Sequence, residues 1–123
     1  MPMVDDLILV DMRERRVEFH GKPASAAGGE ALTFDGEIRY QVVDALKAEY
    51  TVNDAFLACH LSAEEAVRGQ ILRHPLSAVP PNRALIAAEA QAILATRVEP
   101  WGLTIYTLEL YRIAAVADTV NVG

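Results

Sequence analysis

The sequence predicts an α+β fold in which a small, twisted, mainly antiparallel sheet is packed by roughly two to four helices. Three observations predict it. Strand-like alternation fills the first part of the chain, two helical stretches fill the middle, and an apolar strand-like stretch at 103–113 nearly closes it. A chain of 123 residues suits one domain with one core. We therefore expect a single domain over 1–123, with its core at 7–113 and a tail at 114–123, and a sheet of about four to six strands.

The first strands are predicted on either side of a charged turn. The apolar run Leu7–Met12 has the length of a strand, and Val17–Phe19 resumes the alternation after the charged residues 13–16. We expect these two segments to pair as a hairpin. The segment 21–29 is rich in glycine and small residues and predicts a mobile loop.

Further strands are predicted before the helices begin. A short strand is expected at 31–34, followed by a tight turn at the Asp-Gly pair 35–36. Ile38, Tyr40 and Val42 then alternate with polar residues. This pattern is typical of a strand with one face in the core and the other facing water.

The first helical stretch begins after a predicted cap at Asn53 or Asp54. The S-x-x-E pattern at 62–65 matches a capping box, from which a helix would restart and run to Pro75. One bent helix and two separate helices both fit this pattern.

A second, Ala-rich helix is predicted to begin at Pro81 or Asn82 and to end at the Glu-Pro pair 99–100. Trp101 and Gly102 join it to the last strand. We expect Trp101 to be largely buried between this helix and the sheet, because burial of its large ring locks the two together. Gly102 is expected to leave the helix with a positive φ.

The last predicted strand changes its apolar phase part-way. Leu103 and Ile105 share one face by alternation, whereas Leu108 and Leu110 fall on the other. A β-bulge near 106–107 would bring all four to one face. Alternatively, both faces of this strand are covered.

Composition and charge exclude several classes of function. A net charge of −6 disfavours nucleic-acid binding, which needs clustered Lys and Arg, and electrostatic adhesion to an anionic leaflet. No apolar stretch approaches the roughly 20 residues of a membrane span. The N-terminus lacks the basic segment and long apolar run of a signal peptide. We expect a soluble, cytoplasmic chain, which is either complete or excised from a longer protein.

Histidine, cysteine and serine are present, but not in the patterns that catalytic or metal sites require. His20, His60 and His74 lack paired ligand spacing, and the adjacent Cys59 and His60 would point about 100° apart on a helix. Cys59 is the single cysteine, which excludes an internal disulfide. No phosphate-binding loop and no G-x-S-x-G motif occur. The sequence therefore predicts no catalytic, cofactor-binding or metal-binding residue.

The charged clusters are interpreted as solvated charge. Asp5, Asp6 and Asp11 lie near the end of the chain, and the Glu-Glu pair at 64–65 is explained by helix capping. Paired carboxylates in an active site would have to face each other across a cleft. The basic cluster at 13–16 is interpreted as a solvated turn in preference to an anion site.

Four segments carry a resemblance to a known family. Residues 40–48 form an alternating strand that ends in a Tyr-x-Val-x-Asp turn, and residues 66–73 form a helix that ends in a Leu-Arg pair. The segment 101–113 begins Trp-Gly-Leu-x-Ile and continues with spaced apolar residues, and 7–19 is the first predicted hairpin. In their order and spacing these segments resemble the SPFH, or band-seven, domain of stomatins, prohibitins and flotillins.

The resemblance implies the SPFH-domain fold and a non-catalytic scaffold. Such a scaffold self-associates, organises membrane microdomains and regulates membrane-associated partners such as proteases or channels. Family members usually carry an N-terminal membrane anchor and a C-terminal coiled coil, whereas 114–123 shows no heptad pattern. Pro80 and Pro81 also replace the charged residues usual before the second helix. Any membrane association is therefore expected to be peripheral, through a longer parent protein or through partners.

Self-association is predicted to be weak. The first or the last strand is expected to lie at a sheet edge, where unpaired backbone groups recruit other strands. Tyr106, Tyr111 and Arg112 belong to residue types enriched at interfaces. Because the net charge of −6 makes copies repel at low salt, we expect dimers or trimers that tighten as salt rises.

Two other classes of function stay open. A small-ligand or lipid-binding α+β module would show a closed apolar pocket between the Ala-rich helix and the sheet. A small enzyme would show a cleft with buried carboxylates of shifted pKa.

Overall fold

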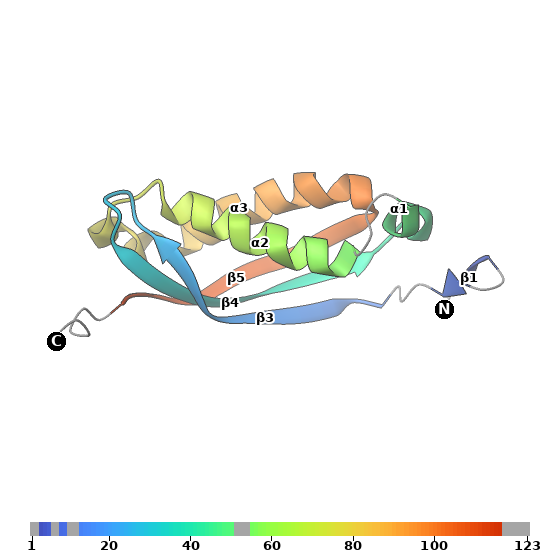
Figure 1. Ribbon diagram of the computed structural model, residues 1–123, viewed down its shortest axis with the longest axis horizontal. Coiled ribbons are helices and arrows are strands. Elements are labelled where there is room, and N and C mark those ends of the chain that lie inside the picture. The colour runs from blue at the N-terminus through green and yellow to red at the C-terminus, as the bar shows by residue number, and fades with distance from the viewer. Residues whose placement is uncertain (1–2, 6–7, 10–12, 51–54, 117–123) are drawn as a thin grey trace.

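The computed structural model describes residues 3–5, 8–9, 13–50 and 55–116. Within them, three long strands form an antiparallel sheet in the order β3-β4-β5. Helices α2 and α3 cover one face of this sheet, as Figure 1 shows, and the opposite face is left open by the described elements. The predicted α+β fold with a small antiparallel sheet packed by helices is therefore confirmed.

Strands β3 (Arg15–Ser25) and β4 (Ala31–Val42) form one long hairpin. The loop predicted at 21–29 is wrong over 21–25, which continues β3 after a bulge at Gly21, whose φ is +61°. Proline at position 23 is tolerated because β3 is an edge strand. The turn itself is confined to 26–30, where the Ala26 amide donates to the Glu30 carbonyl at 3.0 Å.

The Asp-Gly pair 35–36 makes no turn, because it lies inside β4. Its Asp35 carboxylate accepts a hydrogen bond from the Gly21 amide at 2.6 Å. Asp35 thus satisfies a backbone group exposed by the bulge of the neighbouring strand. The two short strands predicted around this pair are therefore one long strand. Among the described residues the main sheet has three strands, where four to six were expected.

The predicted hairpin between Leu7–Met12 and Val17–Phe19 is also wrong. β2 (Ile8–Leu9) pairs with β1 (Met3–Asp5) in a separate two-stranded sheet. Residues 17–19 pair with β4 instead, because the long hairpin offers β3 a partner along its whole length. Residues 6–7 and 10–12 lie outside the described part of the chain.

Helix α1 (Ala45–Tyr50) follows β4, and α2 (Ala55–Ile71) is one continuous helix. Ser62 lies in the middle of α2 and is 9% exposed, so the 62–65 pattern does not cap a helix start. The buried face of α2 runs unbroken from Ala55 to Ile71, which leaves no reason for a break. The predicted caps Asn53 and Asp54 lie outside the described residues.

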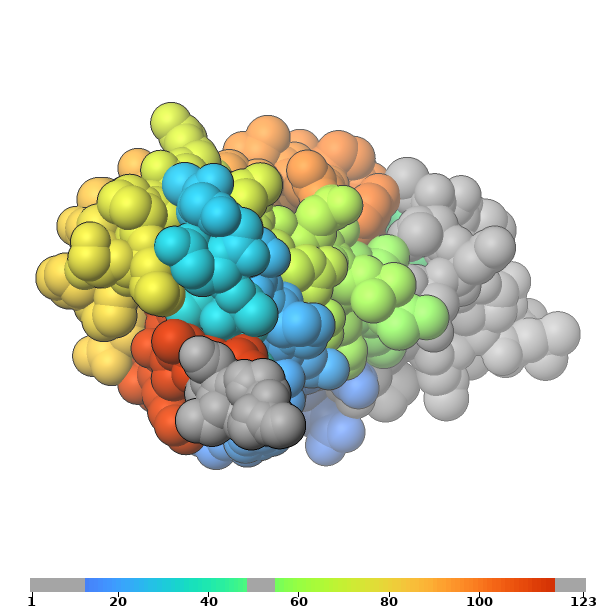
Figure 2. All heavy atoms as spheres, turned by 60° about the vertical axis from the view of Figure 1, so that its left-hand side comes forward, coloured from blue at the N-terminus to red at the C-terminus, as the bar shows by residue number. Residues whose placement is uncertain are grey.

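Two short 3₁₀ turns, η1 (Leu76–Ala78) and η2 (Pro80–Asn82), lead into α3 (Arg83–Val98). They lie at one end of the molecule beside the β3–β4 turn, as Figure 2 shows, and the Ala27 amide donates to the His74 carbonyl there at 2.8 Å. The start and end predicted for the Ala-rich helix agree with α3 and the following turn η3 (Glu99–Trp101).

The core fills the space between the helices and the covered face of the sheet. Small residues on α3 let it approach β5 closely, while α2 packs against α3 and β3. The predicted core face of β4 is confirmed, because Ile38, Tyr40 and Val42 are fully buried. The largest fully buried side chains are Phe19, Leu32, Phe34, Ile38, Tyr40, Val42, Val67, Ile71, Val79, Ile86, Leu94 and Val98.

Gly102 turns the chain from η3 into β5 with the predicted positive φ, here +79°. Its carbonyl accepts hydrogen bonds from the Val43 and Asp44 amides at 2.7 and 3.1 Å, which ties the start of β5 to the end of β4. Trp101 packs against the core but is only partly buried. Its burial is less complete than predicted, because η3 places it at the margin of the helix layer.

Candidate interaction surface

Strand β5 (Leu103–Ala115) forms one edge of the sheet, as predicted for the last strand. Its pairing with β4 shifts twice: Arg39 pairs with Thr107 and Tyr40 with Ile105, while Asp35 pairs with Arg112 and Gly36 with Leu110. The extra residues at these two bulges are the tyrosines at 106 and 111. The predicted bulge near 106–107 is confirmed, and a second one follows it.

The two bulges bring all the leucines and isoleucines of β5 to the face that packs against the helices. The residues facing the helices are Leu103, Ile105, Leu108, Leu110 and Ile113, and all of them are buried. A bulge inserts one unpaired residue and so restores the alternation after each slip. The reading in which both faces of this strand are covered is therefore not needed.

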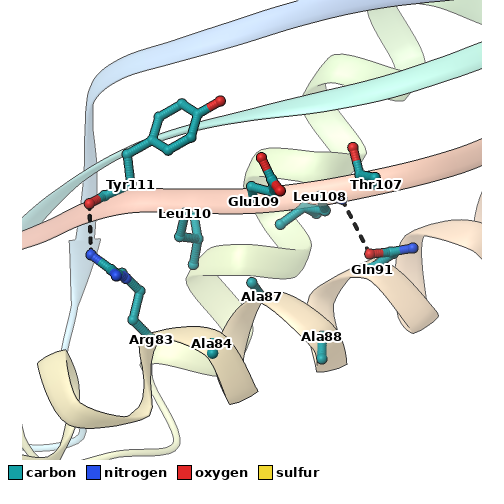
Figure 3. Close-up of a pocket in the computed structure, with 10 residues that line it drawn as sticks. All are labelled: Arg83, Ala84, Ala87, Ala88, Gln91, Thr107, Leu108, Glu109, Leu110 and Tyr111. Atoms are coloured by element: carbon teal, nitrogen blue, oxygen red, sulfur yellow. Dashed lines mark hydrogen bonds between the residues drawn. The ribbon is translucent and has the colours of Figure 1, made fainter.

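Both bulge tyrosines extend over the open face of the sheet. Tyr106 is 45% exposed, and its hydroxyl donates to Gln41 at 2.5 Å. Tyr111 is 48% exposed and points away from α3 in Figure 3. Arg112 beside it is also exposed. The residues predicted for an interface thus lie together along one edge strand, where a partner can reach them.

The open face is charged, and its centre is Glu37. This side chain on β4 is buried, with the residue 5% exposed, although none of the described helices covers it. The Arg16 guanidinium lies 3.2 Å from the carboxylate, and the Tyr111 phenol hydrogen-bonds it. That bond, together with burial and nearby carboxylates, raises the pKa of Tyr111 to about 12. Long side chains from the neighbouring strands therefore shield Glu37 from solvent.

Glu37 is the middle of a row of carboxylates. Glu18 on β3 and Glu109 on β5 pair directly with it across the sheet. Like charges in opposing positions are destabilising, and Arg16 offsets this by contacting both Glu37 and Glu18. Glu109 is exposed and makes no ion pair within the described residues.

A groove of about 490 Å³ runs between α3 and the edge of β5. Ala84, Ala87 and Ala88 line its helix side, and Leu108 and Leu110 line its strand side (Figure 3). The groove is open to solvent, whereas the space between the helices and the sheet is filled by buried side chains.

Two side chains of α3 hold backbone groups of β5 along this groove. The Gln91 side-chain amide donates to the Tyr106 carbonyl and accepts from the Leu108 amide, both at 3.2 Å. The Arg83 guanidinium donates to the Tyr111 carbonyl at 2.7 Å. Sequence reasoning missed both residues, because a Gln and an Arg on a helix carry no signal of such a contact.

The histidines and the cysteine are not brought together into a site. His20 contacts only the exposed Glu18 among the described contacts, at 3.3 Å, and His60 contacts the Tyr40 hydroxyl at 3.3 Å. Burial raises the pKa of the Cys59 thiol to about 12, which disfavours the reactive thiolate. In the described part of the chain no three metal-ligating side chains form a group that could hold a metal ion.

The acidic pair at 64–65 forms ion pairs and caps no helix. Glu64 lies 3.5 Å from both Lys22 and Arg68, and Glu65 pairs with Arg97 of α3. These contacts link α2 to β3 and to α3. Of the other predicted acidic cluster, positions 6 and 11 lie outside the described residues.

The basic cluster at 13–16 is only partly a turn, because Arg15 and Arg16 begin β3. Arg15 lies over the Phe56 ring at 4.0 Å, Arg16 contacts Glu37, and Glu14 accepts from Arg39 at 2.7 Å. The charges of these three residues are used within the chain, which agrees with the preference against an anion site.

The sequence comparisons identify a family whose α+β fold is consistent with this open antiparallel sheet and its helices. The chain matches the SPFH domain / Band 7 family over residues 1–121. It belongs to this family. Mouse stomatin is 26% identical over 110 residues, which cover 89% of this chain and 39% of stomatin. Human stomatin-like protein 3 is likewise 26% identical over 89% of this chain and 38% of its own length.

An uncharacterized protein of Methanothermobacter thermautotrophicus is 27% identical over 121 residues, 98% of this chain and 38% of that protein. The chain thus spans less than two fifths of the length of these relatives. None of its described helices has the length and apolarity that a membrane span requires.

Proposed function

We propose that this SPFH domain is a non-catalytic scaffold that self-associates and organises or regulates membrane-associated partners. The family is one of membrane-associated scaffolds and is generally non-catalytic, which supports the class of function. The observation that carries self-association is the exposed row of Tyr106, Tyr111 and Arg112 on the open side of the sheet. Aromatic residues and Arg are enriched in protein interfaces. The whole of 1–123 acts as one domain in this proposal, and the predicted tail begins later than position 114, because β5 extends to Ala115.

The self-association is weak. A net charge of −6 makes two copies repel, and this repulsion is screened as salt rises. Dimers or trimers therefore form at high protein concentration and tighten with salt. Partners are membrane-associated proteins, such as proteases or channels, with no role for nucleic acid. The domain acts at the cytoplasmic side, held near the membrane by a longer parent protein or by its partners.

Sedimentation velocity over a concentration series at low and high salt tests the proposal. We expect the weight-average mass to rise with concentration, and more so at high salt. The double substitution of Tyr106 and Tyr111 by serine should abolish this rise. Leu72→Ser, directly after the end of α2, removes a similarly exposed apolar side chain elsewhere and should leave this rise unchanged. A strict monomer at high micromolar concentration in both salts would reject self-association.

The ligand-binding alternative needs a closed apolar pocket between α3 and the sheet. In the described structure this space is filled by Ile86, Ala90 and Leu94, which are fully buried. The hollows found at the described surface are open grooves. No observation favours this alternative, and none favours an enzyme, over a scaffold.

A further inference from the structure

At the edge of β5 beside α3, a side chain makes the hydrogen bonds that a neighbouring strand would make. In an antiparallel sheet, the neighbouring strand donates to a carbonyl and accepts from an amide of the edge strand. The Gln91 side chain does both, to Tyr106 and Leu108, at 3.2 Å. The Gln91 amide thus takes the place of one hydrogen-bonding residue of a neighbouring strand. If Gln91 moved aside, the same carbonyl and amide of β5 could bond to the backbone of an added strand.

The groove next to Gln91 leaves room for such a strand. Neighbouring strands lie about 4.8 Å apart, and the alanines at 84, 87 and 88 present no bulky side chain on the helix side. The volume of about 490 Å³ extends from Gln91 to Arg83. Arg83 closes the far end by holding the Tyr111 carbonyl at 2.7 Å.

The two sides of β5 dictate the sequence of an added strand. Leu108 and Leu110 point towards α3, whereas Thr107, Glu109 and Tyr111 point away from it, as Figure 3 shows. Side chains directly opposite on adjacent strands share a face. An added strand would therefore place apolar residues over the alanines and polar residues on the open face. The residue beside the unpaired carboxylate of Glu109 would have to be basic.

We propose that the α3–β5 groove receives an extended segment of a partner protein as a fourth strand, with alternating apolar and polar residues and a Lys or Arg beside Glu109. This rests on the proposed scaffold function, which supplies membrane-associated partners. Cytoplasmic segments that flank membrane spans are enriched in Lys and Arg, so such partners carry the required chemistry. A second copy of this chain fits less well, because two-fold pairing centred on the groove sets Glu109 against itself.

Gln91 then sets the affinity of the groove. The partner backbone has to displace two hydrogen bonds that Gln91 makes within the chain, and each lost bond offsets one that is gained. Gln91→Ala removes the competitor without adding bulk. It should tighten binding of an extended segment by about fivefold.

Fluorescence anisotropy with labelled, blocked peptides and the full chain tests the inference. The probe is a short peptide in which valine alternates with lysine. The comparison peptides carry glutamate in place of lysine, or a central proline, which cannot donate to a ladder. We expect the lysine peptide to bind and the other two to bind at least about tenfold more weakly. Amide hydrogen exchange should slow at Leu108 in the Gln91→Ala complex.

Matched variants locate the site. Glu109→Arg should weaken the lysine peptide about tenfold and favour the glutamate peptide. Glu99→Gln, at another exposed carboxylate, should change affinity by less than about twofold. Circular dichroism checks that each variant is folded, and Glu109→Gln, a milder change, should weaken the lysine peptide in the same direction.

Three results would overturn the inference. Equal binding of the lysine and proline peptides would show charge attraction without strand addition. Absence of lysine-peptide binding while sedimentation still shows self-association would reject the groove but leave the scaffold function intact. Tighter self-association of Gln91→Ala, with no gain in peptide binding, would make the occupant a second copy of the chain.

Discussion

The two faces of the sheet differ in how they are buried. On the covered face, side chains such as Phe34, Ile38 and Tyr40 are fully buried under two helices. On the open face, Glu37 is almost as buried, but in the described part of the chain it is single side chains, Arg16 and Tyr111, that cover it. Burial thus has two sources in one sheet, a second layer of structure and neighbouring long side chains.

Because of this difference, the covered face contributes most of the stability, whereas the open face is available for contact with a partner. Apolar burial stabilises by about 25 cal/mol per Å², so changes on the covered face are costly. The open face carries charges in partly exposed ion pairs, which contribute little each. Its side chains are therefore able to meet a partner without loss of the fold.

The largest expected effect is on the covered face. Phe34→Ala should lower the free energy of unfolding by about 3–5 kcal/mol, because it removes a fully buried ring that packs edge-on against Phe19. Urea denaturation followed by circular dichroism measures this loss. Glu109→Ala on the open face should change stability by less than about 0.5 kcal/mol. Similar losses for the two variants would contradict the division between faces.

A substitution at Gly102, where the chain turns from η3 into β5, should lower the free energy of unfolding by nearly as much. Gly102→Ala should cost about 3 kcal/mol, since φ there is +79° and a Cβ would overlap the Asp44 carbonyl oxygen. Gly69→Ala is the matched control in α2, where a Cβ meets no atom within 4 Å. It should stabilise by about 0.5–1 kcal/mol, because alanine is the better helix former. Thermal unfolding of both variants compares them, and equal shifts in Tm would sink this account of Gly102.

Substitution of Glu37 tests whether a side chain buried on the open face contributes to the free energy of unfolding. Glu37→Gln removes the charge that Arg16 contacts at 3.2 Å, and should cost about 1–2 kcal/mol. Glu18→Gln removes an exposed partner of the same Arg16 and should cost less than about 0.5 kcal/mol. Chemical denaturation at neutral pH distinguishes the two. If both losses are the same, the Arg16–Tyr111 cover does not bury Glu37 in solution.

The smallest effect is expected from Tyr111, and only at high pH. Its pKa is raised from 10.0 to about 12 in the folded chain. The folded state therefore holds this proton more tightly than the unfolded state, and the associated stability, complete below pH 10, is lost as pH rises towards 12. Ultraviolet titration of the phenols should show a late-titrating group that Tyr111→Phe removes. If Tyr111→Phe leaves the titration curve unchanged above pH 11, the bond to Glu37 is absent.

Local patterns predicted several elements correctly. Alternation at 38–42 reported a half-buried strand, because period-two burial is visible in the residues themselves. In 103–113 the alternation of apolar and polar residues shifts by one position, and this shift correctly predicted a bulge for the same reason. The turn predicted from the Asp-Gly pair 35–36 and the helix cap predicted from 62–65 were both wrong. A local preference of about 1 kcal/mol is outweighed there by the pairing of a long strand and the packing of a long helix.

The residues alone predict the α+β class, the apolar face of β4 and the family, since each depends on residues near one another in the chain. The tertiary structure decided which backbone groups of β5 are held by α3 and which carboxylates share a row. Gln91 and Leu108 are 17 residues apart, and Arg83 and Tyr111 are 28 apart. Contacts at such separations depend on how α3 packs on the sheet, which is fixed by the whole core and has no local signature.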